Sequence, residues 1–293
     1  MKQLSGWNRI RYRLRRDLCK WLGRRRVRIK NSTPLVSFTF DDFPGSALQA
    51  GGGILRQHGL SGTYYASLGL MGSETPTGRI FEAGDLEGLI ARGHELGCHT
   101  YSHCHAWETP PDVFEQSLIE NQRALDRLLP GAVFRTMSYP ISCARPQTKR
   151  RSQEHFACCR GAGQTFNAGN TDLNYLNAFF LEQSRDDFGA IQRVIDGNAL
   201  AGGWLIFATH DICRNPTPFG CSPVFFDQVV RYAVRSGATI LPVFQACQLA
   251  TQPQTSHSPM PGRSDSKPYT RFPASVSRPP SLGGWRSCGQ FMA

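Results

Sequence analysis

Short apolar runs, each followed by a helical pattern, recur between residues 34 and 250 of this 293-residue chain. The runs are apolar at successive positions rather than at every second one, which is typical of strands buried on both faces of a parallel sheet. We expect strands at residues 35–40, 63–67, 93–99, 132–139, 155–160, 178–182, 204–209 and 238–243. We expect helices at residues 46–58, 85–92, 111–129, 186–201, 222–235 and 244–249.

This alternation predicts the fold class. About seven parallel strands with helices between them fit a single barrel better than two small domains. We therefore expect an α/β protein with a (β/α) barrel that is irregular or distorted relative to a TIM barrel. The sequence has no apolar run of about 18 residues or more, so we expect no membrane-spanning helix.

The positive charge is concentrated at the two ends of the chain. The formal net charge is +11, but residues 31–250 are mildly acidic, whereas residues 1–30 hold twelve lysines and arginines. Residues 251–293 are rich in proline and serine and lack apolar periodicity, which predicts a disordered tail. We therefore divide the chain into a basic N-terminal extension (1–30), a barrel domain (31–250) and the tail (251–293). Because the barrel domain is not basic, we expect no specific nucleic-acid binding.

The first 25 residues have the pattern of a basic amphipathic helix. Its apolar residues recur at steps of three and four: Trp7, Ile10, Leu14, Leu18, Trp21 and Leu22. Such a helix can lie on an anionic membrane surface, with tryptophan and leucine in the interface. The alternatives are a solvated extension and a helix docked on the barrel.

The cysteines and the N-terminal sequence indicate the cellular compartment in which the protein is expected. The ten cysteines show no regular spacing, and no apolar core of a secretory signal follows the first charges. Both features favour reduced thiols. We therefore expect a cytoplasmic protein, with peripheral contact between residues 1–30 and the inner face of an anionic membrane.

Polar groups suited to catalysis follow three of the expected strands. They are Asp41 and Asp42 after the first strand, His99 and His103 after the third, and His210 after a late strand. The carboxyl ends of parallel barrel strands meet at one face, so we expect these side chains to gather there.

The two histidines suggest a metal site. A spacing of four places His99 and His103 on one face of a helical turn, close enough to share an ion. With a carboxylate they form the two-histidine, one-carboxylate set of a catalytic metal with open positions. Adjacent side chains of an extended segment point in opposite directions, so either Asp41 or Asp42 can ligate while the other faces water. The alternative is that both aspartates only cap a helix.

The order of these motifs resembles the polysaccharide deacetylase family, carbohydrate esterase family 4, which includes nodulation protein B-like chitooligosaccharide deacetylases. The similar segments are Thr39-Phe40-Asp41-Asp42, His99-Thr100-Tyr101-Ser102-His103 and Phe207-Ala208-Thr209-His210. The similarity covers about residues 34–246. It implies that Asp42, His99 and His103 bind a divalent metal, most often zinc, that Asp41 is the general base, and that His210 is the general acid.

A third family motif is similar to residues 135–140. The resemblance implies that the backbone N–H of Tyr139 helps to stabilise an oxyanion and that Arg135 orients Asp41, the alternative for Arg135 being a surface ion pair. No match to the family's fourth motif is evident, so the group that orients His210 is not identified.

The resemblance implies a hydrolase that acts on carbon–nitrogen bonds other than peptide bonds. Its substrate class is an acetylated glycan, from which it removes the N-acetyl groups of N-acetylglucosamine units in a polysaccharide or oligosaccharide. One alternative is an O-acetyl polysaccharide esterase on the same barrel. Another is an inert barrel whose basic arm binds a membrane or nucleic acid.

Overall fold

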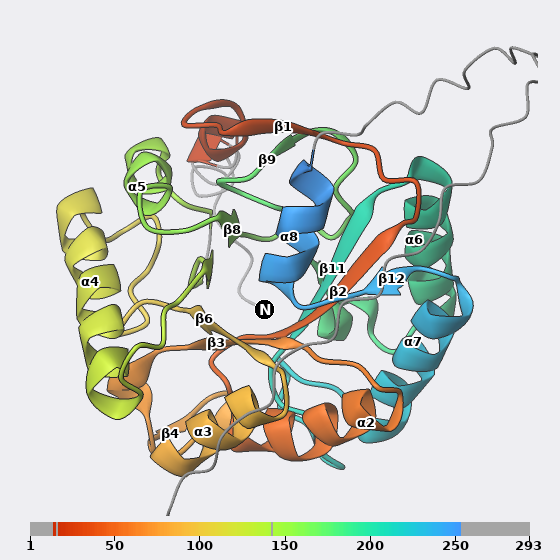
Figure 1. Cartoon of the computed structure of the whole chain (residues 1–293), viewed down its shortest axis with the longest axis horizontal. Helices are drawn as coiled ribbons and strands as arrows, with labels where there is room; N and C mark the ends of the chain where they lie inside the picture. Colours follow the sequence, from red (N-terminus) through yellow and green to blue (C-terminus); the bar gives the residue numbers. More distant parts are fainter. Residues whose placement is uncertain (1–13, 16, 142, 253–293) are drawn as a thin grey trace, which may run out of the picture. The chain divides into compact units, whose positions relative to one another are not determined.

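A curled parallel sheet forms the centre of the computed structural model, which describes residues 14, 15, 17–141 and 143–252 (Figure 1). Its seven strands lie in the order β10-β11-β2-β3-β6-β7-β8, and β12 pairs with β2 beside them. Every pairing in this sheet is parallel. The expected α/β fold with a distorted, seven-strand barrel is therefore confirmed.

The strands are short, and the two longest are completely buried. The bounds are β2 (Leu35–Phe40), β3 (Thr63–Ala66), β6 (Glu95–Cys98), β7 (Thr136–Ser138), β8 (Cys158–Arg160), β10 (Phe179–Phe180), β11 (Trp204–Thr209) and β12 (Thr239–Ile240). All six residues of β2 and all six of β11 are buried. This is why their sequences are apolar without alternation, since both faces of the strand pack against other elements.

Helices cover the outside of the sheet (Figure 1). They are α2 (Gly52–Gln57), α3 (Ala83–Ala91), α4 (Pro111–Leu128), α5 (Pro146–Ser152), α6 (Phe188–Ala201) and α7 (Pro223–Arg235), whereas α8 (Val243–Thr251) lies across one end of the barrel. Side-chain caps fix two of their starts: Asp187 accepts from the N–H of Ala190, and Ser222 accepts from the N–H of Phe225. The expected helix at 46–58 divides into a π-helical turn, Ala47–Gly51, and α2.

The glycines at this junction are required by close packing. A Cβ on Gly51 would lie 2.9 Å from the ring of Phe40, and one on Gly52 would lie 2.8 Å from the hydroxyl of Tyr64. The π-helical turn and α2 therefore approach β2 and β3 more closely than any other residue would allow.

The last helix, α8, closes the amino end of the barrel. Its first N–H groups bond to groups near the starts of β3 and β6: Val243 donates to the hydroxyl of Thr63, and Phe244 donates to the carboxyl group of Glu95, both at 2.9 Å. The opposite end, where the strands finish, is the end at which the candidate site lies.

The segment before β2 is part of the folded body. β1 (Arg26–Ile29) pairs antiparallel with β9 (Gly169–Asp172), so the body begins before residue 31. Residues 17–21 are helical. Of the three arrangements open from sequence, the described part of the N-terminal segment is docked. Residues 1–13, the start of the expected helix, and residues 253–293 of the expected tail lie outside the described residues.

A buried lysine holds this segment in place. Lys149 in α5 is fully buried. Its Nζ donates to the carbonyl oxygens of Cys19 (2.6 Å) and Leu22 (3.0 Å) and to Oδ2 of Asp172 (2.6 Å). The ammonium therefore binds the last helical carbonyls of the N-terminal segment and a carboxylate of β9 at once, which suits both the helix dipole and the buried charge.

None of the helices in the described ranges is long and apolar enough to cross a membrane.

Replacing Lys149 tests this anchor. Lys149→Met leaves Asp172 buried without its cation, so we expect the free energy of unfolding to fall by about 3–5 kcal/mol. Arg150→Met, on the neighbouring exposed position, should change it by no more than about 0.5 kcal/mol. Guanidinium unfolding followed by circular dichroism measures both. Equal effects of the two variants would contradict the anchoring role.

Candidate functional site

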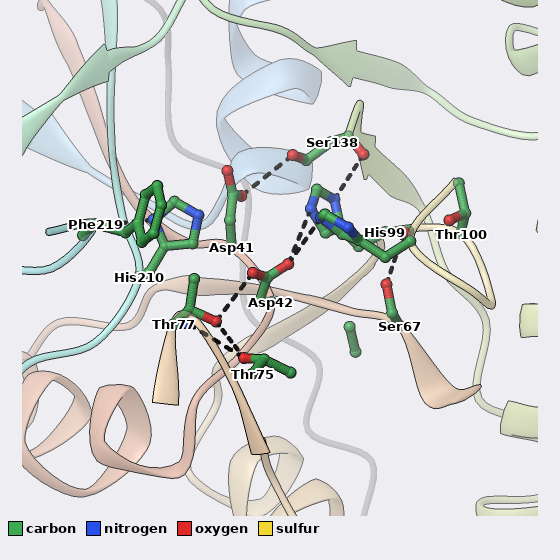
Figure 2. A network of polar contacts seen from close by, with 12 residues as sticks. Asp41, Asp42, Ser67, Thr75, Thr77, His99, Thr100, Ser138, His210 and Phe219 are labelled. Atoms are coloured by element: carbon green, nitrogen blue, oxygen red, sulfur yellow. Dashed lines mark hydrogen bonds and ion pairs between the residues drawn. The ribbon is translucent and has the colours of Figure 1, made fainter. Parts of the chain in front are cut away.

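Asp42, His99 and His103 come together at the carboxyl end of the sheet. Figure 2 labels Asp42 and His99 of this group. One ligand atom from each lies within 4.8 Å of the others. Oδ1 of Asp42 is 3.4 Å from Nε2 of His99 and 3.1 Å from Nε2 of His103. The three residues expected to form a metal site are thus close enough to share one ion.

Hydrogen bonds to neighbouring residues orient the side chains of His99 and Asp42. Nδ1 of His99 lies 2.8 Å from the carbonyl oxygen of Ser138. Since a carbonyl only accepts, Nδ1 carries the proton and Nε2 keeps a lone pair directed at Asp42. Oδ2 of Asp42 accepts from the hydroxyl of Thr77 at 3.1 Å. Thr77 in turn lies 2.9 Å from the Thr75 hydroxyl, in the turn joining β4 (Glu74–Thr75) and β5 (Gly78–Arg79).

These residues fit a divalent cation. Oδ1 of Asp42 is buried, and no donor among the described residues makes a hydrogen bond to it. Burial lowers the pKa of His99 to about 4, so this imidazole is neutral at pH 7 and offers a lone pair rather than a proton. A buried carboxylate oxygen facing a lone pair is unfavourable unless a cation lies between them. Two imidazoles and one carboxylate form a ligand set that zinc and similar ions prefer.

Strained backbone positions the ligands. Four residues at the site have a backbone in the left-handed region, which residues other than glycine rarely adopt. Their φ values are 59° (Asp42), 54° (Phe43), 62° (Thr100) and 53° (His103). Such residues cost about 1–3 kcal/mol each and cluster at functional sites. The expectation that His99 and His103 share a helical turn is wrong, because the left-handed residues bend this segment into a loop.

Side chains of the surrounding elements stabilise that loop. The hydroxyl of Thr100 accepts from the N–H of Cys104 at 2.9 Å. Ser117 of α4 accepts from the N–H of Tyr101 at 3.0 Å. The side-chain amide of Asn121, also in α4, donates to the carbonyl of Ala66 and accepts from the N–H of Leu68. The helix α4 therefore holds the segments that leave β3 and β6.

Asp41 is buried and paired with a cation that the sequence analysis did not identify. Its Oδ1 accepts from the guanidinium of Arg160 and, at 3.2 Å, from the hydroxyl of Ser138. Burial alone would raise the pKa of Asp41, but the charge and hydrogen bond of Arg160, together with His99 and His210, outweigh burial and hold the pKa below its ordinary value. Both contacts use Oδ1, so Oδ2 stays available. Asp41 is therefore a carboxylate at neutral pH.

The expectation that Arg135 orients Asp41 is wrong. Arg135 stands before β7, at the amino end of the barrel, where its guanidinium lies 5.9 Å from the ring centroid of Phe244. Arg160 is the last residue of β8, so it lies at the same end as Asp41. The signal that could have identified it is an arginine that ends an apolar strand.

The expected role of the Tyr139 N–H also needs correction. This N–H donates to the carbonyl oxygen of Arg160 at 2.9 Å, as part of the pairing between β7 and β8. It is therefore not free to bind an oxyanion. The Tyr139 ring is buried and stacks on Tyr175 at a centroid distance of 5.9 Å.

His210 follows β11 and lies on the far side of Asp41 and Asp42 from His99 (Figure 2). Its Nδ1 lies 3.0 Å from the carbonyl oxygen of Phe219, and the two rings meet edge to face. As for His99, a carbonyl oxygen can only accept, so Nδ1 of His210 carries a proton. Nε2 is then the nitrogen that can exchange a proton with a substrate. The group that orients His210 is thus a backbone carbonyl, which no sequence motif could have shown.

The loop that carries Phe219 is held by Asp211. Asp211 accepts from the backbone N–H of Thr217 at 2.9 Å and from its hydroxyl at 2.6 Å. The N–H of Cys221 donates to the Asp211 carbonyl at 3.1 Å. Asp211 therefore stabilises the loop whose Phe219 carbonyl orients His210.

Comparison with known proteins shows a similarity to one family over part of the chain. Residues 28–155 match the family model described as "Polysaccharide deacetylase". The match covers less than half of the chain, so residues 28–155 are similar to this family. Among curated proteins, no sequence matches this chain.

Several solved structures share the fold. A family 4 acetyl xylan esterase from Clostridium thermocellum, in complex with a cobalt ion, is 18% identical, with 73% of this chain and 91% of that chain covered and a TM-score of 0.51. T48 deacetylase with substrate is 17% identical, with 73% and 90% covered and a TM-score of 0.50. The Bacillus anthracis protein BA3943, a pseudoenzyme, is 10% identical, with 74% and 66% covered and a TM-score of 0.51. At these identities the likeness shows the fold alone.

Metal content tests the site directly. We expect the purified protein to bind about one divalent ion per chain and Asp42→Ala to lose it, because the variant removes the only carboxylate of the ligand set. Asp41→Asn should keep the ion, since Asp41 pairs with Arg160 instead. Elemental analysis after dialysis measures all three proteins. An ion retained by Asp42→Ala would contradict the assignment.

Proposed function

We propose that this chain is a divalent-metal-dependent hydrolase that removes N-acetyl groups from an N-acetylglucosamine-containing polysaccharide or oligosaccharide. The observation that carries the proposal is the convergence of Asp42, His99 and His103 at the carboxyl end of the sheet, where Figure 2 shows Asp41 and His210 beside Asp42. The match of residues 28–155 to the polysaccharide deacetylase family model supports the reaction class. It does not by itself establish activity, because the family also contains pseudoenzymes such as BA3943.

Asp42, His99 and His103 would hold the metal ion. When bound, such a cation supplies Lewis-acid polarisation of an acetyl carbonyl and increases the acidity of water. We propose zinc, because neutral imidazole and carboxylate ligands in an open site suit it.

Asp41 is proposed as the general base. Its pKa lies below the ordinary value, so the carboxylate is ready to accept a proton from water at Oδ2. Arg160 and Ser138 fix the other oxygen and thereby the orientation of the carboxylate. The hydroxyl of Ser138 binds Asp41 while its carbonyl binds His99, so one residue sets the spacing between the proposed base and a proposed metal ligand.

His210 is proposed as the general acid. An amide nitrogen cannot leave as an anion, so the departing amine must be protonated as the bond breaks. Nδ1 of His210 donates to the Phe219 carbonyl, so the proton that passes to the amine nitrogen would be one that Nε2 carries in the doubly protonated ring.

The same groups would also hydrolyse an O-acetyl ester, and the likeness to an acetyl xylan esterase keeps this alternative open. Acetate release from chitooligosaccharides and from acetylated xylan, assayed side by side, distinguishes the two substrates. We expect faster release from chitooligosaccharides, loss of activity on chelation and recovery when zinc is returned.

Asp41→Asn is the matched catalytic test. It should lower kcat by roughly 10²–10⁴-fold with the metal still bound, as loss of a general base does. Activity indifferent to the chelator, or unchanged in Asp41→Asn, would contradict the proposal. No acetate from either substrate would favour an inert barrel.

Arg160→Gln tests how the charge of Asp41 is set. Without the guanidinium, burial acts on Asp41 with less opposition, so the pKa of the carboxyl rises. Because the base must be deprotonated, the acidic limb of the rate–pH profile should then move to higher pH, by about 1–3 units. Arg135→Gln, at the other end of the barrel, should leave the limb in place. The pH dependence of kcat/KM measures both, and a shift in Arg135→Gln alone would overturn this account.

A further inference from the structure

A pocket lies beside the docked N-terminal segment. It has a volume of about 320 Å³. One wall is formed by Lys20, Trp21 and Arg24, and the other by residues between Gly163 and Asn177, which follow β8. None of the proposed metal or catalytic residues lines it.

The pocket is separate from the metal centre, but its walls contact segments that lead to it. Tyr175, in its wall, stacks on Tyr139, the residue after Ser138. Gly163 stands three positions after Arg160, the partner of Asp41. The N-terminal segment also reaches the loop that follows His103, where Arg15 bonds to Glu108 and its guanidinium lies 5.4 Å from the ring centroid of Trp107. The walls of the pocket are therefore connected by direct contacts to segments that also carry residues of the metal centre.

The lining has the chemistry of a sugar-binding site. The side chain of Trp21 is large, flat and apolar, yet 68% of the residue is exposed. Beside it lie the hydroxyl of Thr165 and the amides of Asn170 and Asn177. A pyranose ring presents polarised C–H groups on its faces, which stack on an aromatic ring, and hydroxyls at its edges, which bond to amides and hydroxyls.

The charge of the lining favours an anionic ligand. Lys20 and Arg24 are basic, and Nε of Arg24 is buried with no hydrogen-bond partner among the described residues. Asp172 is the acidic residue of the lining, and its carboxylate is already bound by Lys149 and by the N–H groups of Arg25 and Asn174. The pocket is therefore left with positive charge, part of it on a guanidinium suited to a carboxylate.

We propose that this pocket binds an acidic, carboxylate-bearing sugar of the same glycan whose acetyl group lies at the metal centre. The inference deepens the proposed function and rests on it for the identity of the glycan. The binding of an acidic sugar can nevertheless be measured without catalysis. The substrate class that follows is a polymer in which N-acetylated sugars are interspersed with uronic acids.

The test compares two tetrasaccharides by titration calorimetry on the full chain. One alternates glucuronate with N-acetylglucosamine, and the other is the neutral N-acetylglucosamine tetramer. At low ionic strength we expect the acidic tetrasaccharide to bind about tenfold more tightly, and the preference to shrink in salt as the charges are screened.

Matched variants locate the preference. The double variant Lys20→Gln/Arg24→Gln should abolish it, whereas Arg26→Gln/Arg28→Gln, which removes two exposed charges of β1 outside the lining, should keep it. Trp21→Ala should weaken both oligosaccharides by about the same factor. Thermal melting of each variant shows that it is folded.

Equal affinity for the two tetrasaccharides, absence of binding to either, or equal loss in both double variants would overturn the proposal. Binding of the full chain to anionic vesicles in place of the oligosaccharide would also overturn it. An acidic preference that is intact in a protein that releases no acetate would support this pocket and refute only the proposed activity.

Discussion

Two buried carboxylates stand next to each other at the end of β2, and much of the site is arranged around their charge. Removing a carboxylate from water costs several kcal/mol unless positive charge or hydrogen bonds replace the solvent. Asp41 receives the guanidinium of Arg160. Asp42 receives one hydroxyl and faces two imidazoles, which leaves the position that a divalent cation fits. The two aspartates thus obtain different partners and can carry different tasks.

The second constraint is the direction of the strands. In a parallel barrel, all carboxyl ends lie on one face, and residues from distant parts of the sequence meet there. β2 contributes the aspartates, β6 leads to the histidine pair, β7 ends at Ser138 and β8 ends at Arg160. The amino face is closed by α8, whose first N–H groups bond to side chains of β3 and β6. The chemistry is therefore confined to one end of the molecule.

The sequence pattern of the N-terminal segment is compatible with several arrangements, and packing selects one of them. Its charge and apolar spacing permitted a membrane-surface helix, a free extension or a docked one. The described part is docked because Lys149 satisfies carbonyls of Cys19 and Leu22 and pairs with Asp172. Packing of this kind depends on a lysine more than a hundred residues away, so no pattern within the segment itself could indicate it.

The sequence by itself determined the barrel, the order of its strands along the chain, and Asp41, Asp42, His99, His103 and His210 as candidate residues. These follow from local apolar runs and from the positions where the runs stop. Tertiary structure alone decided that Arg160 rather than Arg135 pairs with Asp41, that the Tyr139 N–H is used by β8, and that a carbonyl of Phe219 orients His210. The physical reason is that hydrogen bonds and ion pairs of this kind depend on which strand lies beside which, and on which end of a strand a residue occupies. Neither is encoded in the spacing of residues along a single strand.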